Sequence, residues 1–188
     1  SYSLVARADS DDICAPDRFE KQVRYFEEHP EVGIISSYID EFNEDWKKPT
    51  HLKTLPLTHD ELYEMAKFRN PLNHMSIMMR KDDVLRIGSY RHIPYIEDYE
   101  LWVRAMINGI RIGNIGEVLV HARIGNGMVQ RRGTKKYIKS WHLMNKDMIK
   151  AGMIGYATYA RNMISIIAFV FMPVRLKGFL YKKVLRKG

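Results

Sequence analysis

Three acidic residues crowd together near the start of the chain. Asp9, Asp11 and Asp12 place three carboxylates within four positions, at the end of the largely apolar run YSLVARAD (2–9). Like charges repel one another, so a folded chain keeps such a cluster most readily where a cation neutralises it. Mg²⁺ and Mn²⁺ prefer oxygen ligands and take one or two protein carboxylates together with substrate phosphates. The spacing of Asp9 and Asp11 predicts a metal–diphosphate site, and the alternative is that Asp11 or Asp12 caps the next helix.

A second acidic pair, Glu97 and Asp98, stands at the predicted start of another helix. A carboxylate at the mouth of a cleft can act as a general base and take the proton of an attacking hydroxyl group. The alternative is that both residues only stabilise the helix, because negative charge is favoured near the positive end of the helix dipole.

Few other residues indicate chemistry. His74 lies in the segment NPLNHMS, although a lone histidine is more often a hydrogen-bonded structural residue. The sequence contains no glycine-rich phosphate loop of the Walker or Rossmann type and no Ser/His/Asp arrangement with a local signature. Its single cysteine, Cys14, excludes an intramolecular disulfide and a cysteine-rich zinc module.

The elements that would position these residues alternate along the chain. Hydrophobic spacing and helix-end signals predict strands over 2–9, 31–42 and 75–81, one or two strands over 110–124, and helices over 16–30, 58–68 and 96–109. Residues 43–57 are expected to form a loop. Two further helices are predicted over about 134–151 and 155–186, with Pro173 breaking or kinking the second. This order predicts a layered α/β domain followed by a helical tail.

Three segments, in this order, resemble glycosyltransferase family 2. ARADSDDICAPDRFEKQV (6–23) is similar to the D-x-D block of that family. NPLNHMSIMMRKDDVLRIGSY (70–90) resembles its central acceptor-side block. IEDYELWVRAMINGIRIGNIGEVLVHAR (96–123) resembles its E-D-x-x-L-W block and the strand that follows. The continuation RIGNGMVQRRGTKKYIKS is similar to a branch of enzymes that build bacterial surface polysaccharides.

The resemblance implies a GT-A fold, a mixed-sheet α/β domain that uses a nucleotide-diphosphate sugar and inverts the anomeric carbon. By position, Asp9 would face the nucleotide ribose or the metal. Asp11 would be the principal contact of an Mg²⁺ or Mn²⁺ ion that bridges to the donor diphosphate. Asp98 would be the base that deprotonates the acceptor hydroxyl, with Glu97 beside it.

The resemblance also places His74, Trp102 and Arg123 on the acceptor side. Trp102 fits the apolar face of its helix as well, and we favour a core position for it. Many family members carry a histidine shortly after the arginine that matches Arg123, as a further metal or phosphate contact. Here the corresponding residue is Gly125, so a third metal contact is not predicted.

Family members usually begin with a strand and a P-x-Y-N-like turn that bind the nucleotide base, before the D-x-D block. In this sequence the aspartates already begin at Asp9. We therefore expect residues 1–130 to be the C-terminal part of a GT-A catalytic domain that lacks the N-terminal nucleotide-binding part.

Charge divides the chain near residue 130. Residues 131–188 hold fourteen of the 30 lysines and arginines and a single acid, Asp147, which gives a formal net charge of +13, against −5 for residues 1–130. The apolar run MISIIAFVFMPV (163–174) is shorter than the ~20 residues that span a bilayer. We interpret residues 131–188 as a basic helical tail that lies on an anionic membrane surface. The alternative is a hydrophobic helix packed on the domain.

Together these features predict a transferase that acts on a saccharide or lipid-linked saccharide acceptor in surface polysaccharide biosynthesis. Its expected location is cytoplasmic, peripheral at the inner face of the cell membrane. The alternatives are a non-catalytic module that binds the membrane surface and an inactive transferase fragment. Basic charge also suits a nucleic-acid binder, but no recognised motif supports one, so no nucleic-acid partner is expected.

Overall fold

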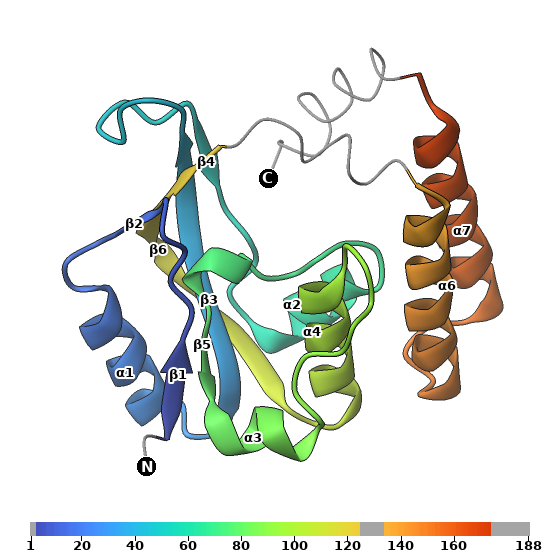
Figure 1. Cartoon of the computed structure of the whole chain (residues 1–188). Helices are drawn as coiled ribbons and strands as arrows, with labels where there is room; N and C mark the ends of the chain where they lie inside the picture. Colours follow the sequence, from blue (N-terminus) through green and yellow to red (C-terminus); the bar gives the residue numbers. More distant parts are fainter. Residues whose placement is uncertain (1–2, 125–133, 174–188) are drawn as a thin grey trace.

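A mixed sheet forms the centre of the fold, and its two longest strands, β3 (Val32–Phe42) and β6 (Arg111–Arg123), run parallel side by side. The structure is a computed structural model that describes residues 3–124 and 134–173 (Figure 1). The strand order is β1-β5-β3-β6-β2, with β4 against the last part of β3. The short strands all pair antiparallel: β1 (Leu4–Ala6), β2 (Ile13–Cys14), β4 (His51–Lys53) and β5 (Met78–Arg80).

Helices cover both faces of this sheet (Figure 1). One face carries α1 (Arg18–Glu28). The other carries α2 (His59–Ala66), α4 (Glu97–Ile107) and the short helix α3 (Lys81–Arg86). The sheet is therefore the middle layer, and the ends of its strands are the places where side chains from both helical layers can meet.

Neighbouring residues of β3 belong to two different apolar clusters. Ile34 faces the larger cluster, which includes Trp102 of α4, and Ile35 faces the smaller one, which includes Phe26 of α1. Both isoleucines are completely buried. A strand covered on both faces needs apolar residues at successive positions, which explains the almost continuous apolar run of β3.

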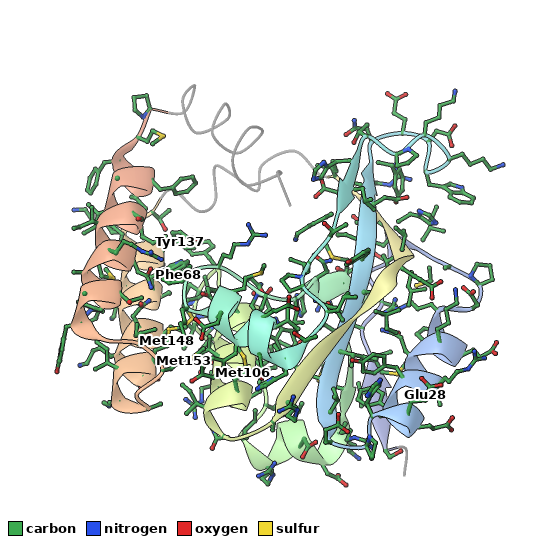
Figure 2. All side chains as sticks on the ribbon, turned by 180° about the vertical axis from the view of Figure 1, so that it is seen from behind. Glu28, Phe68, Met106, Tyr137, Met148 and Met153 are labelled. Atoms are coloured by element: carbon green, nitrogen blue, oxygen red, sulfur yellow. The ribbon has the colours of Figure 1, made fainter. Side chains whose placement is uncertain are left out.

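The helices α6 (Lys135–Lys150) and α7 (Tyr156–Phe171) form an antiparallel hairpin that packs against the α2/α4 side of the fold (Figure 1). Figure 2 shows Tyr137, Met148 and Met153 turned toward Phe68 and Met106. The buried residues of the hairpin belong to the same apolar cluster as those of α2 and α4. The hairpin thus shares its core with the α/β part of the chain.

A buried polar residue fastens this hairpin. Asn162 of α7 donates hydrogen bonds from Nδ2 to the backbone oxygen of Lys67 and to Oδ1 of Asn145, both at 2.8 Å. The guanidinium of the neighbouring Arg161 lies 3.7 Å from the ring centroid of Phe68. One turn of α7 therefore contacts both α6 and the segment that follows α2.

Most of the long elements match the sequence-based expectations. The helices predicted over 16–30, 58–68 and 96–109 are α1, α2 and α4, and the strands predicted over 31–42 and 110–124 are β3 and β6. The Thr58 and Glu61 pair at the start of α2 forms the expected capping box, with Thr58 N donating to Glu61 at 3.4 Å.

The short elements differ from those expectations. The strand predicted over 75–81 begins as a 3₁₀ turn, η1 (His74–Ser76), before β5 starts. The expected loop over 43–57 contains β4, while β2 and α3 were not anticipated, because elements of two to six residues are too short to show a hydrophobic period. The helix predicted over 155–186 ends as α7 at Phe171, and the part of that prediction beyond residue 173 lies outside the described residues.

Replacing Asn162 by alanine should lower the free energy of unfolding by about 1–3 kcal/mol, because the oxygens of Lys67 and Asn145 lose a buried donor. Urea denaturation followed by circular dichroism measures the change. Ser165→Ala, on the exposed side of the same helix, is the matched control and should shift stability much less. Equal effects of the two substitutions would contradict the role assigned to Asn162.

Candidate active site

The D-x-D segment follows the end of β1 and turns toward the end of β6. The guanidinium of Arg7 forms an ion pair with Asp9, with Nε 2.8 Å from Oδ1. Asp12 accepts a hydrogen bond from the backbone N–H of Arg123 at 2.9 Å, and burial raises the pKa of its carboxyl above the usual value. Asp11 is exposed and forms no hydrogen bond or ion pair with any of the described residues. The three carboxylates therefore differ in how free they are to accept a ligand.

A buried cation lies beneath this segment. Arg18, the first residue of α1, is 0% exposed and donates to the backbone oxygens of Arg7 at 2.8 Å and Ile77 at 3.4 Å. Its Nε also donates to Gln22, and the amide of Gln22 donates to the backbone oxygen of Ser76 at 2.7 Å. One helix therefore holds both the D-x-D segment and the turn near residue 76.

That turn, which follows α2, is also fastened to β3. Asn73 donates from Nδ2 to the backbone oxygen of Ser37 at 2.8 Å. The backbone N–H of Ser37 donates to the hydroxyl of Ser76 at 3.0 Å. His74, the first residue of η1, lies between these two anchors, so its position is set by the sheet.

Helix α4 begins with Glu97 and Asp98, at the helix end that favours negative charge. Asp98 accepts a hydrogen bond at Oδ2 from Nδ2 of Asn70 at 2.7 Å, and the Oδ1 of Asn70 accepts one from the backbone N–H of Leu72 at 3.2 Å. Two residues before the helix, Tyr95 adopts a φ of 74°, a left-handed conformation that is strained for a bulky side chain. Such strain gathers at functional sites, where the surrounding structure maintains it.

His74, Tyr90 and Trp102 form an aromatic group at the centre of the site. Nε2 of His74 lies 3.0 Å from the hydroxyl of Tyr90. Both rings meet Trp102 edge to face, at centroid distances of 6.0 Å and 6.4 Å. Trp102 itself is 0% exposed, so it is the floor beneath the other two rings and takes the core position favoured from the sequence.

Charged groups from two separate elements act on this aromatic group. Burial lowers the pKa of His74 below its usual value, which makes the neutral ring the main form at neutral pH, and burial raises the pKa of Tyr90 to about 12. The charges that act on the His74 ring come from the D-x-D segment and from the start of α4: Asp98, Arg7, Asp9 and Glu97. The structure thus brings together Asp9, His74, Glu97, Asp98 and Trp102, which lie far apart in the sequence.

Two polar residues of this site, Asn70 and Tyr90, were not singled out from the sequence. Tyr90 follows a loop that is held by Arg104 of α4, which donates to the backbone oxygens of Ile87 and of Ser89, the latter at 2.6 Å. Arg104 is in turn held by a buried ion pair with Glu100 at 2.8 Å. Both missed residues lie in the 70–90 segment, but no periodicity or local motif marks them.

Arg123 lies at the other side of the D-x-D segment. Its side chain donates to the backbone oxygen of Asn43 at 2.9 Å, and its guanidinium lies 4.7 Å from the ring centroid of Phe42. The side chain is therefore engaged with the end of β3, and only its backbone N–H reaches the acidic segment. Gly125, noted in the sequence as a departure from the family pattern, lies outside the described residues.

The D-x-D carboxylates fit a divalent cation whose coordination shell is completed by ligands from another molecule. Across residues 3–124 and 134–173, no group of three or more His, Cys, Asp or Glu side chains is arranged to hold a metal ion. Asp11 is exposed and unengaged, whereas Asp9 is shared with Arg7. One or two carboxylates suit Mg²⁺ when phosphate oxygens and water supply the remaining positions.

Solved structures share this fold. The chain superimposes on the crystal structure of S. aureus TarS 1-349 with a TM-score of 0.61 at 15% identity, covering 98% of this chain and 52% of that one. It also matches the mannosyltransferase PcManGT from Pyrobaculum calidifontis, solved in complex with GDP-Man and Mn²⁺, with a TM-score of 0.51 at 13% identity, covering 97% and 55% of the two chains. The chain spans about half the length of these two solved chains and has a fold found in glycosyltransferases.

Sequence comparison identifies the family. A model described as glycosyl transferase family 2 matches residues 2–88. The amylovoran biosynthesis glycosyltransferase AmsE of Erwinia amylovora is 40% identical over 188 residues, which are 100% of this chain and 70% of that protein. The UDP-Gal:alpha-D-GlcNAc-diphosphoundecaprenol beta-1,3-galactosyltransferase of Escherichia coli is 33% identical over 186 residues, 99% of this chain and 67% of that protein. The chain belongs to glycosyltransferase family 2.

Replacing Arg18 by methionine should lower the free energy of unfolding by about 1–3 kcal/mol, because the buried oxygens of Arg7 and Ile77 lose their donor. Chemical denaturation measures the loss. Arg24→Met, on the exposed side of α1, removes only a surface ion pair with Glu20 and should cost well under about 1 kcal/mol. A loss for Arg18→Met no larger than for Arg24→Met would show that the buried guanidinium does not hold the segment.

The lowered pKa of His74 predicts a pH dependence of stability. The unfolded ring has a pKa of about 6.5 and the folded ring a lower one, so the unfolded state binds more protons as the pH falls through this range. The free energy of unfolding should therefore fall between about pH 7.5 and about pH 5, and by less in His74→Gln, which lacks this titration. Denaturation curves of both proteins at several pH values test this. An identical pH dependence in the two proteins would contradict the prediction.

Proposed function

We propose that this protein transfers a sugar from a nucleotide-diphosphate donor to a hydroxyl group of a saccharide or lipid-linked saccharide acceptor, with inversion, in surface polysaccharide biosynthesis. The observation that carries the proposal is the convergence of two carboxylate groups, around Asp9 and Asp98, on the neutral pair His74 and Tyr90. Membership of glycosyltransferase family 2 and the relative that is named for amylovoran biosynthesis support the same conclusion.

On the donor side, we assign Asp11 and Asp9 to an Mg²⁺ or Mn²⁺ ion and to the donor diphosphate. A divalent ion there would neutralise the charge that develops on the leaving diphosphate. Asp11 is the carboxylate free to accept such an ion, and Arg7 places a fixed positive charge beside Asp9. The mannosyltransferase with a similar fold was solved with GDP-Man and Mn²⁺, which supports the choice of ligands.

On the acceptor side, Asp98 is the proposed general base. Asn70 holds its Oδ2, so Oδ1 is the atom that we assign to the acceptor hydroxyl. As the acceptor oxygen bonds to the anomeric carbon of the donor, its proton passes to Asp98 and the bond from that carbon to the diphosphate oxygen breaks. Attack opposite the leaving group inverts the anomeric centre. Glu97, beside the base, adds to the negative potential that retains the proton.

The remaining assigned residues shape the acceptor side. His74 and Tyr90 are neutral hydrogen-bonding groups on a rigid aromatic floor, which suits the hydroxyl groups of a sugar. Trp102 is that floor, and its role is to position the rings of His74 and Tyr90. Arg123 orders the end of β6 beside Asp12, since its guanidinium is already bound to Asn43.

A location at the inner face of the membrane is part of the proposal. The Escherichia coli relative is named for a diphosphoundecaprenol-linked acceptor, which is a lipid, and residues 131–188 are strongly basic. The second candidate function, a non-catalytic module at the membrane surface, is favoured by that basic segment alone.

Asp98→Asn should lower the rate of sugar transfer by about 10²–10⁴-fold, because asparagine cannot accept the proton of the acceptor hydroxyl. Transfer is measured on the protein as the organism makes it, with donor binding and thermal stability followed in parallel. Both should be unchanged, since asparagine preserves the shape of the side chain. Asp82→Asn, an exposed carboxylate in the first turn of α3, is the control and should leave transfer unchanged. Undiminished transfer by Asp98→Asn would remove Asp98 as the base, and no transfer by the unaltered protein would favour the non-catalytic alternative.

A further inference from the structure

Helix α7 presents an apolar face to solvent. Ile164 is 68% exposed and Phe171 is 69% exposed, although the opposite side of the helix is buried at Asn162 and Val170. A helix on the surface of a water-soluble domain normally turns polar residues outward. The exposed apolar positions recur every three or four residues and are called here the α7 stripe: Ala157, Ala160, Ile164, Ile167, Ala168 and Phe171.

Such a stripe marks a contact surface. Exposed apolar residues scattered singly are ordinary, whereas a contiguous apolar patch indicates a surface that another molecule or a membrane covers. α7 contains one charged residue, Arg161, which stacks on Phe68 beside the stripe. From Asn162 to Phe171 the helix carries no charged residue, so the outer half of the stripe is uninterrupted by charge.

Positive charge gathers at one end of the same hairpin. Lys135, Lys136 and Lys139 are exposed in the first turns of α6, where no acidic residue is present. In the described part of the chain, none of the three forms a salt bridge. The N-terminus of a helix is itself electropositive, so these lysines repel both the helix end and one another. An external anion would relieve that repulsion.

The lysines and the outer half of the stripe lie at the same end of the hairpin. Because α6 and α7 are antiparallel, the first turns of α6 lie beside the last turns of α7 (Figure 1). The sequence after Pro173 continues from that end with six further lysines and arginines and no acid. In the described residues, this end of the hairpin thus combines an apolar stripe with exposed lysines.

This combination selects a lipid surface over the other possible occupants. A second copy of the chain would bring one formal charge of +13 from residues 131–188 against another, which opposes association through this face. Among the described helices none is long and apolar enough to cross a bilayer. A 16-residue helix is about 24 Å long and can lie in the plane of the interface, with its apolar side among the acyl chains and lysines at the phosphates.

We infer that the α7 stripe and the three lysines of α6 form a docking surface for an anionic lipid bilayer. The inference rests on the membrane location in the proposed function, but it does not depend on the transfer reaction. Anionic headgroups are the external anions that the lysines lack, and acyl chains cover the stripe.

Flotation with vesicles tests the inference. The unaltered chain should bind vesicles of phosphatidylcholine with about 30% phosphatidylglycerol and bind pure phosphatidylcholine weakly. The double variant Ile164→Ser, Phe171→Ser should lower the affinity for the anionic vesicles by about tenfold or more, and Lys135→Gln, Lys136→Gln, Lys139→Gln should lower it by a similar factor. Leu52→Ser, Leu85→Ser is the matched control, because both leucines are more than half exposed but lie outside the hairpin, and it should bind like the unaltered chain.

The outcomes separate the possible occupants. Equal binding by the unaltered chain and the α7 double variant would overturn the inference, because residues outside the stripe would then carry the membrane contact. A dimer in gel filtration that only the α7 double variant disperses would overturn it as well, because a second copy of the chain would then cover the stripe. Transfer to a short-chain, water-soluble acceptor should be unchanged in the α7 double variant, so loss of vesicle binding and loss of transfer can be told apart.

Discussion

The buried guanidinium of Arg18 is the interaction on which the geometry of the site depends. A buried arginine usually pairs with a carboxylate, but here its described partners are two backbone oxygens, the sulfur of Cys14 and the amide of Gln22. The two oxygens belong to the segments that lead to Asp9 and from η1, so one side chain fixes the D-x-D segment relative to the central turn. The positive charge that offsets the repulsion among the three carboxylates is that of Arg7, which forms an ion pair with Asp9 and opposes the rise that burial causes in the pKa of Asp12.

The site is an arrangement of two acidic edges around a neutral centre. The D-x-D segment and the start of α4 each bring carboxylates to His74 and Tyr90; burial lowers the pKa of His74 so that its ring is neutral, and the tyrosine hydroxyl is neutral at pH 7 in any case. A neutral pair can donate or accept hydrogen bonds without competing with the carboxylates, which bind the cation and accept the proton in the proposed reaction. For His74 this neutrality follows from burial, to which the packing of its ring against Trp102 contributes.

Sequence reasoning succeeded where a pattern is local or periodic. The apolar period of α4 and the Thr58 and Glu61 capping box are visible in a few consecutive residues. The D-x-D cluster was identified as a candidate because three carboxylates in four positions are costly. In contrast, the hydrogen bond from Asn70 to Asp98 joins residues 28 positions apart, and no short-range pattern encodes it. Arg123 shows the same limit, since residue type alone does not reveal that its side chain is bound to Asn43, whereas the apolar face of its helix already favoured the buried position of Trp102.

The packing of Tyr99 couples local opening of α4 to that of α6. Tyr99 follows Asp98 directly, donates from its hydroxyl to the backbone oxygen of Ala66 at 2.7 Å, and meets Trp141 of α6 edge to face at 5.5 Å. The helix that carries the proposed base is thereby clamped between α2 and the α6–α7 hairpin. Local opening of α4 has to separate these contacts as well, so the central amide hydrogens of α4 and α6 belong to one cooperative unit and exchange with solvent through the same opening event.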